Sequence, residues 1–438
     1  MLGVRIFSLL LALLPAGAFA QTLHSLEGTE VPQELLGVYR LYQEPRARHL
    51  RSPLGYRPVY LTHYGRHGSR YVKYDSQYGH VRSVLAAADS AGVLTPSGDS
   101  LWMEYSAIYP LLEGRTMYLT PLGLEQHRGI AARMVGNFPS LFRPGAHIDA
   151  VASTTSRTVQ SMDAFCEAML SAEPGLDIVR ESSRERMYCL NPYSSVSGTA
   201  SEWDLVWNSP DAPSTPAKNL VAAKLLDHTS FTARIFKDSL WVSANVDACK
   251  FCSDLYYIAI DIPNTPVAGV DLCKYFKLSE LEALNNIDTF QAYCDKGRYS
   301  KDGSTGRQWA LSQYILGDMV DKAVSDLESG ECVARLRFGH DGCLMAMYAM
   351  LGIAPWGCCI EDDIEAARNW DSSLTPMACN LQVIVYRNRR GRMLLRVLYN
   401  EEDFKLPLKT VRRRFYRPAD LLEFCRSKID EARTVLGV

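Results

Sequence analysis

Three short apolar segments, each followed at once by polar residues and then by a helical pattern, most constrain what this chain can fold into. The first is VYLT at residues 59–62, the second is IDAVAST at 148–154 and the third is VARLRFGHD at 333–341. Apolar residues recur at helical spacing after each of them, over residues 81–88, in SRTVQSMDAFCEAML and in CLMAMYAML. Strand–loop–helix units joined by long connections predict an α/β fold, with a layered core around a central, mostly parallel sheet.

The middle of the chain has a different character. Residues 166–330 contain several prolines and short helical patterns, and no strand alternation dominates there. We therefore predict a mostly α-helical cap inserted at residues 166–330, with the first part of the core at 21–165 and the second part at 331–438. The second part should contain a hairpin that turns at residues 388–391, with glycine in the turn, and a final helix started by proline.

The first twenty residues have the layout of a cleavable secretory signal. One basic residue, Arg5, precedes an apolar run over residues 6–14, and small residues lead to Ala20. The run is shorter than the roughly 20 apolar residues that a membrane helix needs, so we predict a signal peptide at residues 1–20 and a periplasmic or secreted protein. The alternative is an uncleaved anchor. No later segment is apolar enough to span a bilayer, so no membrane span is expected in the mature chain.

The charges and cysteines exclude some functions and leave others open. With 47 basic and 49 acidic residues, the overall field indicates neither a nucleic acid partner nor a membrane surface. Twelve cysteines in an exported protein make disulfides plausible, but the sequence does not specify their pairing. The CKFC segment at 249–252 is a weak zinc signal, because no second pair and no histidines accompany it, and we interpret it as a disulfide or as inert thiols. The oligomeric state is left open.

Polar residues follow each of the three predicted strands. The first cluster is RHGSR at residues 66–70, the second is Arg157 in STTSRT, and the third is His340 with Asp341. In an open α/β sheet, ligands bind in the crevice at the carboxyl ends of the strands. We therefore expect the three clusters to converge on one site.

The residue types in these clusters suit phosphoryl transfer. A phosphate monoester carries two negative charges, and arginine offers it planar, paired donors that stay charged. Arg66, Arg70 and Arg157 are the predicted phosphate clamp, with His340 as a fourth donor. Because these arginines would neutralise the phosphate, neither a metal ion nor a cofactor is predicted.

The same clusters hold candidates for the covalent and proton-transfer steps. His67 has an imidazole nitrogen able to attack phosphorus and form a phosphohistidine. Gly68 lets the backbone approach the phosphate without a clashing Cβ. Asp341 is the predicted proton donor to the leaving alkoxide, and then the base that activates water. Taken singly, His67 would be an ordinary turn histidine, Arg157 a surface arginine and Asp341 a helix cap.

The three motifs, in this order, resemble those of the histidine acid phosphatase branch of the histidine phosphatase superfamily. The C-terminal segment LLRVLYNEEDFKLPL also resembles that branch, and HYGRHGSRY is similar to the multiple inositol polyphosphate phosphatases, including bacterial phytases. Those enzymes usually have His-Ala-Glu at the proton-donor motif, whereas His340-Asp341 here matches the His-Asp form of acid phosphatases and other phytases. The resemblance implies a phosphatase that acts through phosphohistidine, with inositol hexakisphosphate as the preferred substrate. The alternatives are a general acid or sugar phosphatase, and a polyanion-binding protein that has lost turnover.

Two further basic features have more than one interpretation. Lys73 follows the first motif closely and is predicted to contact additional phosphates of a polyanionic substrate, although a solvated lysine is equally consistent with the sequence. The segment KTVRRRFYRP at 409–418 is interpreted as a solvated basic face.

Overall fold

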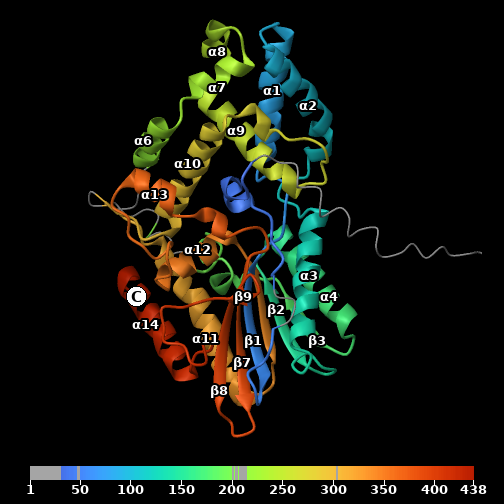
Figure 1. The fold of residues 1–438 in the computed structure, drawn as a ribbon, viewed down its shortest axis with the longest axis vertical. Coiled ribbons are helices and arrows are strands. Elements are labelled where there is room, and N and C mark those ends of the chain that lie inside the picture. Colours follow the sequence, from blue (N-terminus) through green and yellow to red (C-terminus); the bar gives the residue numbers. More distant parts are fainter. Residues whose placement is uncertain (1–30, 47–49, 200–201, 203–205, 207–214, 302–303) are drawn as a thin grey trace, which may run out of the picture.

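The computed structural model describes residues 31–46, 50–199, 202, 206, 215–301 and 304–438. The predicted signal peptide lies outside the described residues. A central sheet with helices on both faces forms one half of the molecule, and a layer of helices stands over one end of that sheet (Figure 1). The predicted α/β class with a central sheet is confirmed.

The sheet has seven strands in the order β3-β2-β6-β1-β7-β8-β9. The strands β3, β2, β6 and β1 are parallel to one another, and β7, β8 and β9 continue the sheet in antiparallel pairs. Ala334 of β6 pairs with Leu61 of β1 on one side and with Ile148 of β2 on the other, so β6 fills the place between two strands that come much earlier in the chain. The bounds are β1 (Tyr56–Arg66), β2 (His147–Ala152), β3 (Asp177–Glu181), β6 (Ala334–Gly339), β7 (Asn380–Asn388), β8 (Met393–Tyr399) and β9 (Glu402–Asp403), with a separate pair β4 (Ser300–Lys301) and β5 (Ser304–Thr305).

The central strands are buried on both faces, as their apolar composition predicts. Leu61, Leu336 and Ile384 on β1, β6 and β7 have no exposed surface. The predicted hairpin joins β7 to β8, and Gly391 in its turn has φ +75°, a conformation that favours glycine.

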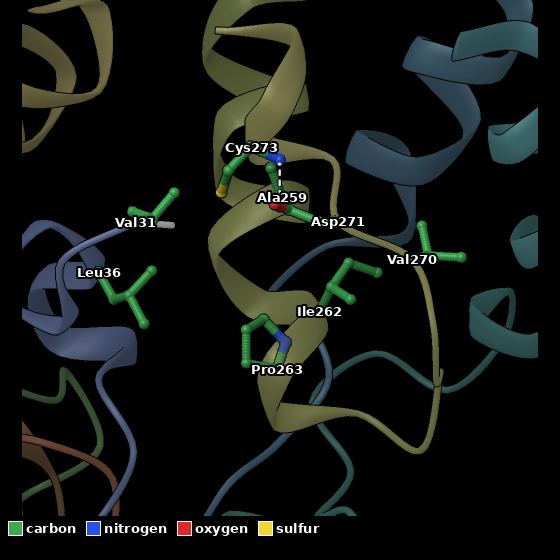
Figure 2. Close-up of a pocket in the computed structure, with 8 residues that line it drawn as sticks. All are labelled: Val31, Leu36, Ala259, Ile262, Pro263, Val270, Asp271 and Cys273. Atoms are coloured by element: carbon green, nitrogen blue, oxygen red, sulfur yellow. Dashed lines mark hydrogen bonds between the residues drawn. The ribbon is translucent and has the colours of Figure 1, made fainter. Parts of the chain in front are cut away.

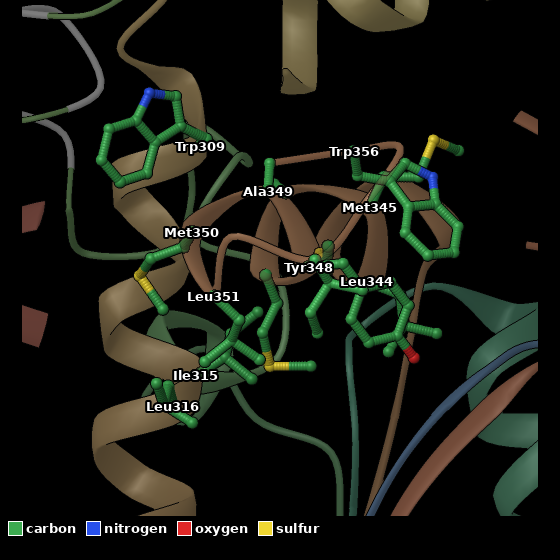
Figure 3. Packing of buried hydrophobic residues seen from close by; sticks show 14 of the residues in the cluster. Trp309, Ile315, Leu316, Leu344, Met345, Tyr348, Ala349, Met350, Leu351 and Trp356 are labelled. Atoms are coloured by element: carbon green, nitrogen blue, oxygen red, sulfur yellow. The ribbon is translucent and has the colours of Figure 1, made fainter. Parts of the chain in front are cut away.

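Helices cover both faces of the sheet (Figure 1). On one face, Ile130, Met134 and Phe165 of α3 and α4 pack against the strands. On the other face, Ile315 and Leu344 belong to a larger cluster that joins α11, α12 and α14 to β1. Figure 3 shows part of that cluster, with Trp309, Ile315 and Leu316 near the buried helix α12. The bounds are α3 (Pro121–Asn137), α4 (Ser156–Ala172), α11 (Gln313–Ser329), α12 (Asp341–Met350) and α14 (Pro418–Leu436).

The layer of helices over the sheet is built from two stretches of the chain. Val81 and Leu101 on α1 and α2 share one apolar cluster with Phe231 and Leu255 on α7 and α9, so helices that precede β2 pack with helices from the middle of the chain. The division of the chain into a core and one inserted cap stays a prediction. The bounds are α1 (Asp75–Ser90), α2 (Pro96–Leu112), α6 (Thr215–Leu225), α7 (His228–Ile235), α8 (Ser239–Asn245), α9 (Ala248–Asp261), α10 (Leu278–Lys296) and α13 (Asp363–Asn369), with 3-10 helices η2 (Gln33–Tyr39), η3 (Met187–Cys189), η4 (Ile262–Asn264), η5 (Cys273–Tyr275), η6 (Gln308–Ser312) and η7 (Ser372–Leu374).

All twelve cysteines lie among the described residues, and none of them forms a disulfide there. Cys249 and Cys252 lie one turn apart at the start of α9, the first exposed and the second buried. Among the described residues, no helix is both long and apolar enough to cross a membrane.

Candidate active site

Three neighbouring strand ends bring the predicted polar clusters together. Because β2, β6 and β1 are adjacent and parallel, their carboxyl ends lie at the same edge of the sheet. Backbone hydrogen bonds tie the loops that follow, with the His67 N–H donating to Gly339 O at 3.1 Å and the Ser153 N–H to Phe338 O at 3.0 Å. Arg157 is the second residue of α4, and Asp341 is the first residue of α12. The positive ends of both helices therefore face this edge.

His67 is buried at the centre of this group, with 2% of its surface exposed. Its Nδ1 lies 2.9 Å from the carbonyl oxygen of Gly68. A carbonyl only accepts hydrogen bonds, so Nδ1 carries the proton and Nε2 keeps its lone pair. Burial lowers the pKa of His67 well below its ordinary value, and the charges of Arg157, Arg66 and Arg70 lower it further. The imidazole is therefore neutral, which is the form that can act as a nucleophile.

The loop of Gly68 packs closely on the beginning of α3. A Cβ added at Gly68 would meet the carbonyl oxygen of Gly123 at 2.5 Å and its Cα at 2.7 Å. The Gly68 N–H donates to Ser161 Oγ of α4 at 3.1 Å. The structure thus explains this glycine by contact with a helix backbone, a reason different from the predicted approach to phosphate.

Arg66 is held by atoms from two distant parts of the chain. Its Nη1 donates to the carbonyl oxygens of Val38 and Thr375, the latter at 2.8 Å. Its Nη2 lies 3.1 Å from Asp341 Oδ2, and its Nε is buried with no hydrogen-bond partner among the described residues. One N–H donor of a fixed guanidinium is therefore left to offer to an oxyanion.

Arg157 contacts His340. Its Nη2 is 3.3 Å from Nδ1 of His340, while Nε2 of His340 is 3.0 Å from Ser153 Oγ. Because an arginine donates, Nδ1 of His340 accepts, and the ring is neutral; burial, with the charge of Arg157, lowers the pKa of His340 to about 3. Burial also lowers the pKa of Arg157 to about 10, and its Nε, like that of Arg66, is buried without a partner in the described part of the chain. The ring of His340 lies 5.8 Å from the ring of His67, but both of its nitrogens contact protein, so its role as a phosphate donor stays a prediction.

Arg70 follows the His67 loop and contacts Tyr39 of the N-terminal segment. Its Nη1 donates to Tyr71 O at 2.9 Å, and its Cζ lies 5.0 Å from the ring centre of Tyr39. Burial alone would lower the pKa of Arg70, but Tyr39 and Asp261 outweigh it and raise the pKa. Arg70 therefore remains a cation.

Asp341 is ionised in the structure. Burial would raise its pKa, but the Arg66 guanidinium and the Gly342 N–H, which donates to its Oδ1 at 2.9 Å, outweigh burial and lower the pKa to about 2. The side chain is 27% exposed, so solvent reaches it.

Lys73 lies apart from this group. Its side chain is exposed, and its ammonium sits 5.1 Å from the ring centre of Tyr74. Its predicted contact with substrate stays a prediction. Among the described residues, no cluster of three or more His, Cys, Asp or Glu side chains is arranged to hold a metal ion.

A buried carboxylate, Asp261 at the end of α9, faces the site and was missed by the sequence analysis. It is 1% exposed, and neither of its carboxylate oxygens has a hydrogen-bond partner among the described residues. Burial raises its pKa to about 7, although Arg70 and Arg66 oppose the shift. The sequence does contain a signal for this buried carboxylate, because Asp261 directly follows the apolar run YYIAI.

We expect Asp261→Asn to remove a pH dependence near neutrality. Above pH 7 the ionised carboxylate offsets the charge of Arg70 and Arg66, so KM for a phosphate ester should rise between pH 6 and 8 in the parent protein and rise less in the variant. The raised pKa also means that the fold prefers the protonated acid, so the free energy of unfolding should fall more steeply in the parent than in the variant as pH rises from about 4 to 7.

Steady-state kinetics and thermal unfolding across pH 4–8.5 measure both effects. The exposed Asp89 on α1 provides the control variant Asp89→Asn. Parallel pH profiles for the parent and for Asp261→Asn would contradict the assignment.

Next to α9 there is a small apolar cavity (Figure 2). Its volume of about 20 Å³ is close to that of one water-sized sphere, so it is too small for a phosphate ester. It is lined by Val31, Leu36, Ala259, Ile262, Pro263, Val270, Asp271 and Cys273.

Comparison with known proteins gives one family and several related folds. Residues 65–400 match the family described as the histidine phosphatase superfamily (branch 2), and this range includes all the predicted site residues. No curated protein matches the chain.

Solved structures of similar fold cover most of the chain. The multiple inositol polyphosphate phosphatase of Bifidobacterium longum in complex with inositol hexasulfate has a TM-score of 0.71 at 17% identity, covering 89% of this chain and 96% of that one. Its complex with phosphate gives 0.73 at 16% identity, covering 90% and 98%. The phytase from D. castellii gives 0.67 at 13% identity, covering 92% and 87%. At these identities the likeness is one of fold.

Proposed function

The chain belongs to branch 2 of the histidine phosphatase superfamily, and from that premise we propose that it hydrolyses inositol polyphosphates through a phosphohistidine on His67. The observation that carries the proposal is the neutral imidazole of His67, whose Nε2 lone pair is free among three arginines. A pure binding protein has no need of a neutral, nucleophilic imidazole among three arginines.

In the first step, Nε2 of His67 attacks phosphorus, and the bond from phosphorus to the ester oxygen breaks. Arg66, Arg70 and Arg157 stabilise the charge on the non-bridging oxygens, with the unpartnered Nε–H groups of Arg66 and Arg157 as two of the donors. The departing alkoxide takes the proton of Asp341. Products of this step are the alcohol, phospho-His67 and an ionised Asp341.

The ionised Asp341 of the free protein must gain a proton before it acts as an acid. Its pKa is low because of Arg66, and a bound phosphate dianion would share the charge of that guanidinium and add its own negative charge. Both effects raise the pKa of Asp341 when the substrate binds. The substrate thus brings about the protonation that its own leaving group requires.

In the second step, the carboxylate of Asp341 takes a proton from water as the water oxygen attacks the phosphorus of phospho-His67. The bond from phosphorus to Nε2 breaks, and the lone pair returns to the imidazole. Inorganic phosphate leaves, and Asp341 is again the protonated acid, ready to lose its proton as the site empties.

The choice of inositol polyphosphate rests on the sequence HYGRHGSRY and on the fold shared with the B. longum enzyme, which is recorded with inositol hexasulfate. The His340-Asp341 pair favours the second candidate, a general acid or sugar phosphatase, because the multiple inositol polyphosphate phosphatases usually have His-Ala-Glu there. We further propose residues 166–330 as the cap that sets this choice, Lys73 as a contact for additional phosphates, and an exported location after cleavage near Ala20.

Phosphate release from inositol hexakisphosphate and from p-nitrophenyl phosphate, at matched concentrations from pH 3 to 8, tests the substrate. We expect kcat/KM to be at least about ten-fold higher for the inositol substrate, since several phosphates then share the basic site. Lys73→Ala should raise KM for that substrate and leave p-nitrophenyl phosphate unchanged. A preference for the aryl ester would favour the second candidate function, a general acid or sugar phosphatase.

A further inference from the structure

The end of the sheet opposite the candidate active site carries a dense group of arginines. Strand β1 starts there at Tyr56 and ends beside the site at Arg66, so roughly 33 Å of extended strand separate the two ends. Figure 1 shows the β7–β8 hairpin projecting at this end, away from the layer of helices. We call this group the basic tip, and it consists of Arg57, Arg387, Arg389, Arg390, Arg392, Arg412 and Arg413.

The fold holds these arginines together against their mutual repulsion. Arg57 pairs directly with Arg387 across the antiparallel β1–β7 ladder, where like charges are destabilising. The hairpin turn is fixed by Asn388 Oδ1, which accepts from the N–H groups of Arg390 and Arg392 at 2.9 Å each. The turn therefore holds its arginines on a fixed backbone conformation.

The second loop of the basic tip, which carries Arg412 and Arg413, has a strained backbone. Arg412 and Arg413 have φ of +51° and +71°, a left-handed conformation that is uncommon for residues other than glycine. The buried Phe415 anchors this loop by packing on Tyr386 with ring centres 5.8 Å apart, and Arg412 lies 5.5 Å from the ring centre of Tyr56. Both loops thus present arginines from a rigid base.

The two segments that supply most of the basic tip contain no acidic residue, and Glu401, Glu402 and Asp403 lie between them. Residues 380–400 contain five arginines, and residues 404–418 contain four arginines and two lysines. Neither range contains an Asp or a Glu, although acidic residues slightly outnumber basic ones in the whole chain. Among the described residues, no member of the basic tip forms an ion pair. The neighbouring Arg396 and Arg414 both pair with Asp403, and they line a cleft of about 640 Å³ with mixed charge, so they are not members.

An apolar side chain stands beside these cations. Leu54 is 95% exposed, in a turn that the Tyr56 N–H closes by donating to Pro53 O at 2.9 Å. Arginines with an exposed leucine on a projecting surface fit a flat, anionic, partly apolar partner. Guanidinium groups pair with phosphate diesters, and a leucine enters the boundary between head groups and acyl chains.

We propose that the basic tip docks the protein on an anionic lipid bilayer, with its arginines on the lipid phosphates and Leu54 in the head-group region. The candidate active site then faces away from the bilayer, open to dissolved substrate. Each arginine near an anionic surface contributes about five-fold to partitioning, so several together suffice for reversible attachment at moderate salt.

Co-sedimentation of the full chain with vesicles tests the docking. We expect binding to vesicles of equal parts phosphatidylglycerol and phosphatidylcholine at 50 mM NaCl, loss of most binding at 500 mM NaCl, and none to phosphatidylcholine alone. The triple variant Arg389→Gln, Arg390→Gln, Arg392→Gln should bind about 100-fold more weakly. Leu54→Ser should lower the fraction of the protein that stays bound to the vesicles at 500 mM NaCl.

Matched variants distinguish binding through the basic tip from binding that depends only on the net charge of the protein. Arg82→Gln, Arg368→Gln, Arg426→Gln removes the same charge from exposed positions elsewhere and should retain binding. Equal loss in both triple variants would overturn the proposal, and so would binding to DNA or a sulfated polysaccharide without binding to vesicles. Hydrolysis of p-nitrophenyl phosphate, expected to be unchanged in both, confirms that the variants fold and keeps this test independent of the substrate.

Discussion

His67→Ala should reduce hydrolysis of every phosphate monoester by at least about 10⁴-fold while inorganic phosphate still binds. The proposed nucleophile is lost, and the other histidine of the described site, His340, does not replace it because both of its ring nitrogens contact protein. Binding survives because Arg66, Arg70 and Arg157 are fixed by contacts that do not involve the imidazole.

Two measurements separate the loss of chemistry from the loss of the site. A rapid quench into alkali, with substrate labelled in its phosphate, should trap label on the parent protein and none on the variant, since phosphohistidine is stable in alkali. A rise in Tm on adding phosphate should appear in both proteins. His147→Ala, at the far end of β2, is the control for a histidine outside the site. Turnover within ten-fold of the parent, or label on the variant, would overturn the covalent mechanism.

Asp341→Asn should separate substrates by their leaving groups. We expect kcat/KM for an inositol or sugar phosphate to fall by about 10²–10³-fold, because an alkoxide needs a proton as it leaves, and kcat/KM for p-nitrophenyl phosphate to fall less than about ten-fold. The quantity kcat/KM reports the steps up to departure of the alcohol, so the role of Asp341 as a base in the second step does not enter it. The asparagine keeps the size of the side chain and can still contact Arg66, so the arrangement of the guanidinium should be preserved.

The ratio of the two losses is the decisive quantity. Asp288, a carboxylate on α10 that accepts from Tyr257 Oη at 2.9 Å, provides a control variant near the site: Asp288→Asn should change both substrates by the same factor. If Asp341→Asn also changes them equally, then the aspartate does not donate the proton.

The local parts of the site could be predicted from the sequence, and the contacts between distant segments could not. The strand ends near Arg66, before Arg157 and before His340 could be predicted because apolar β-prone runs stop at polar residues, and parallel strands then force these ends together. The first strand, expected at residues 59–62, in fact continues to Arg66. The hairpin turn at 388–391 was likewise a local signal, and it is confirmed.

Other features depend on contacts that no periodicity encodes. The carbonyl groups of Val38 and Thr375 fix Arg66 from segments 28 and 309 residues away, and backbone carbonyls carry no sequence signal. The packing of α1 on α9 is of the same kind. Lys73 was linked to the site by its nearness in sequence, but Tyr71 and Val72 are buried just before it and the lysine side chain is exposed. Its role is therefore still to be tested.

The position of β6 between β2 and β1 has a consequence for how activity arises in time. Until residue 339 has been synthesised, β1 and β2 lack β6, the strand that lies between them. The pairing of β6 with each of them closes a loop of more than 180 residues. A nascent chain, or an N-terminal fragment left by proteolysis before that point, therefore contains the proposed nucleophile His67 but neither the proposed acid Asp341 nor the edge of the sheet that would hold the two together. On the proposed mechanism, phosphate release begins only when the chain has passed this point.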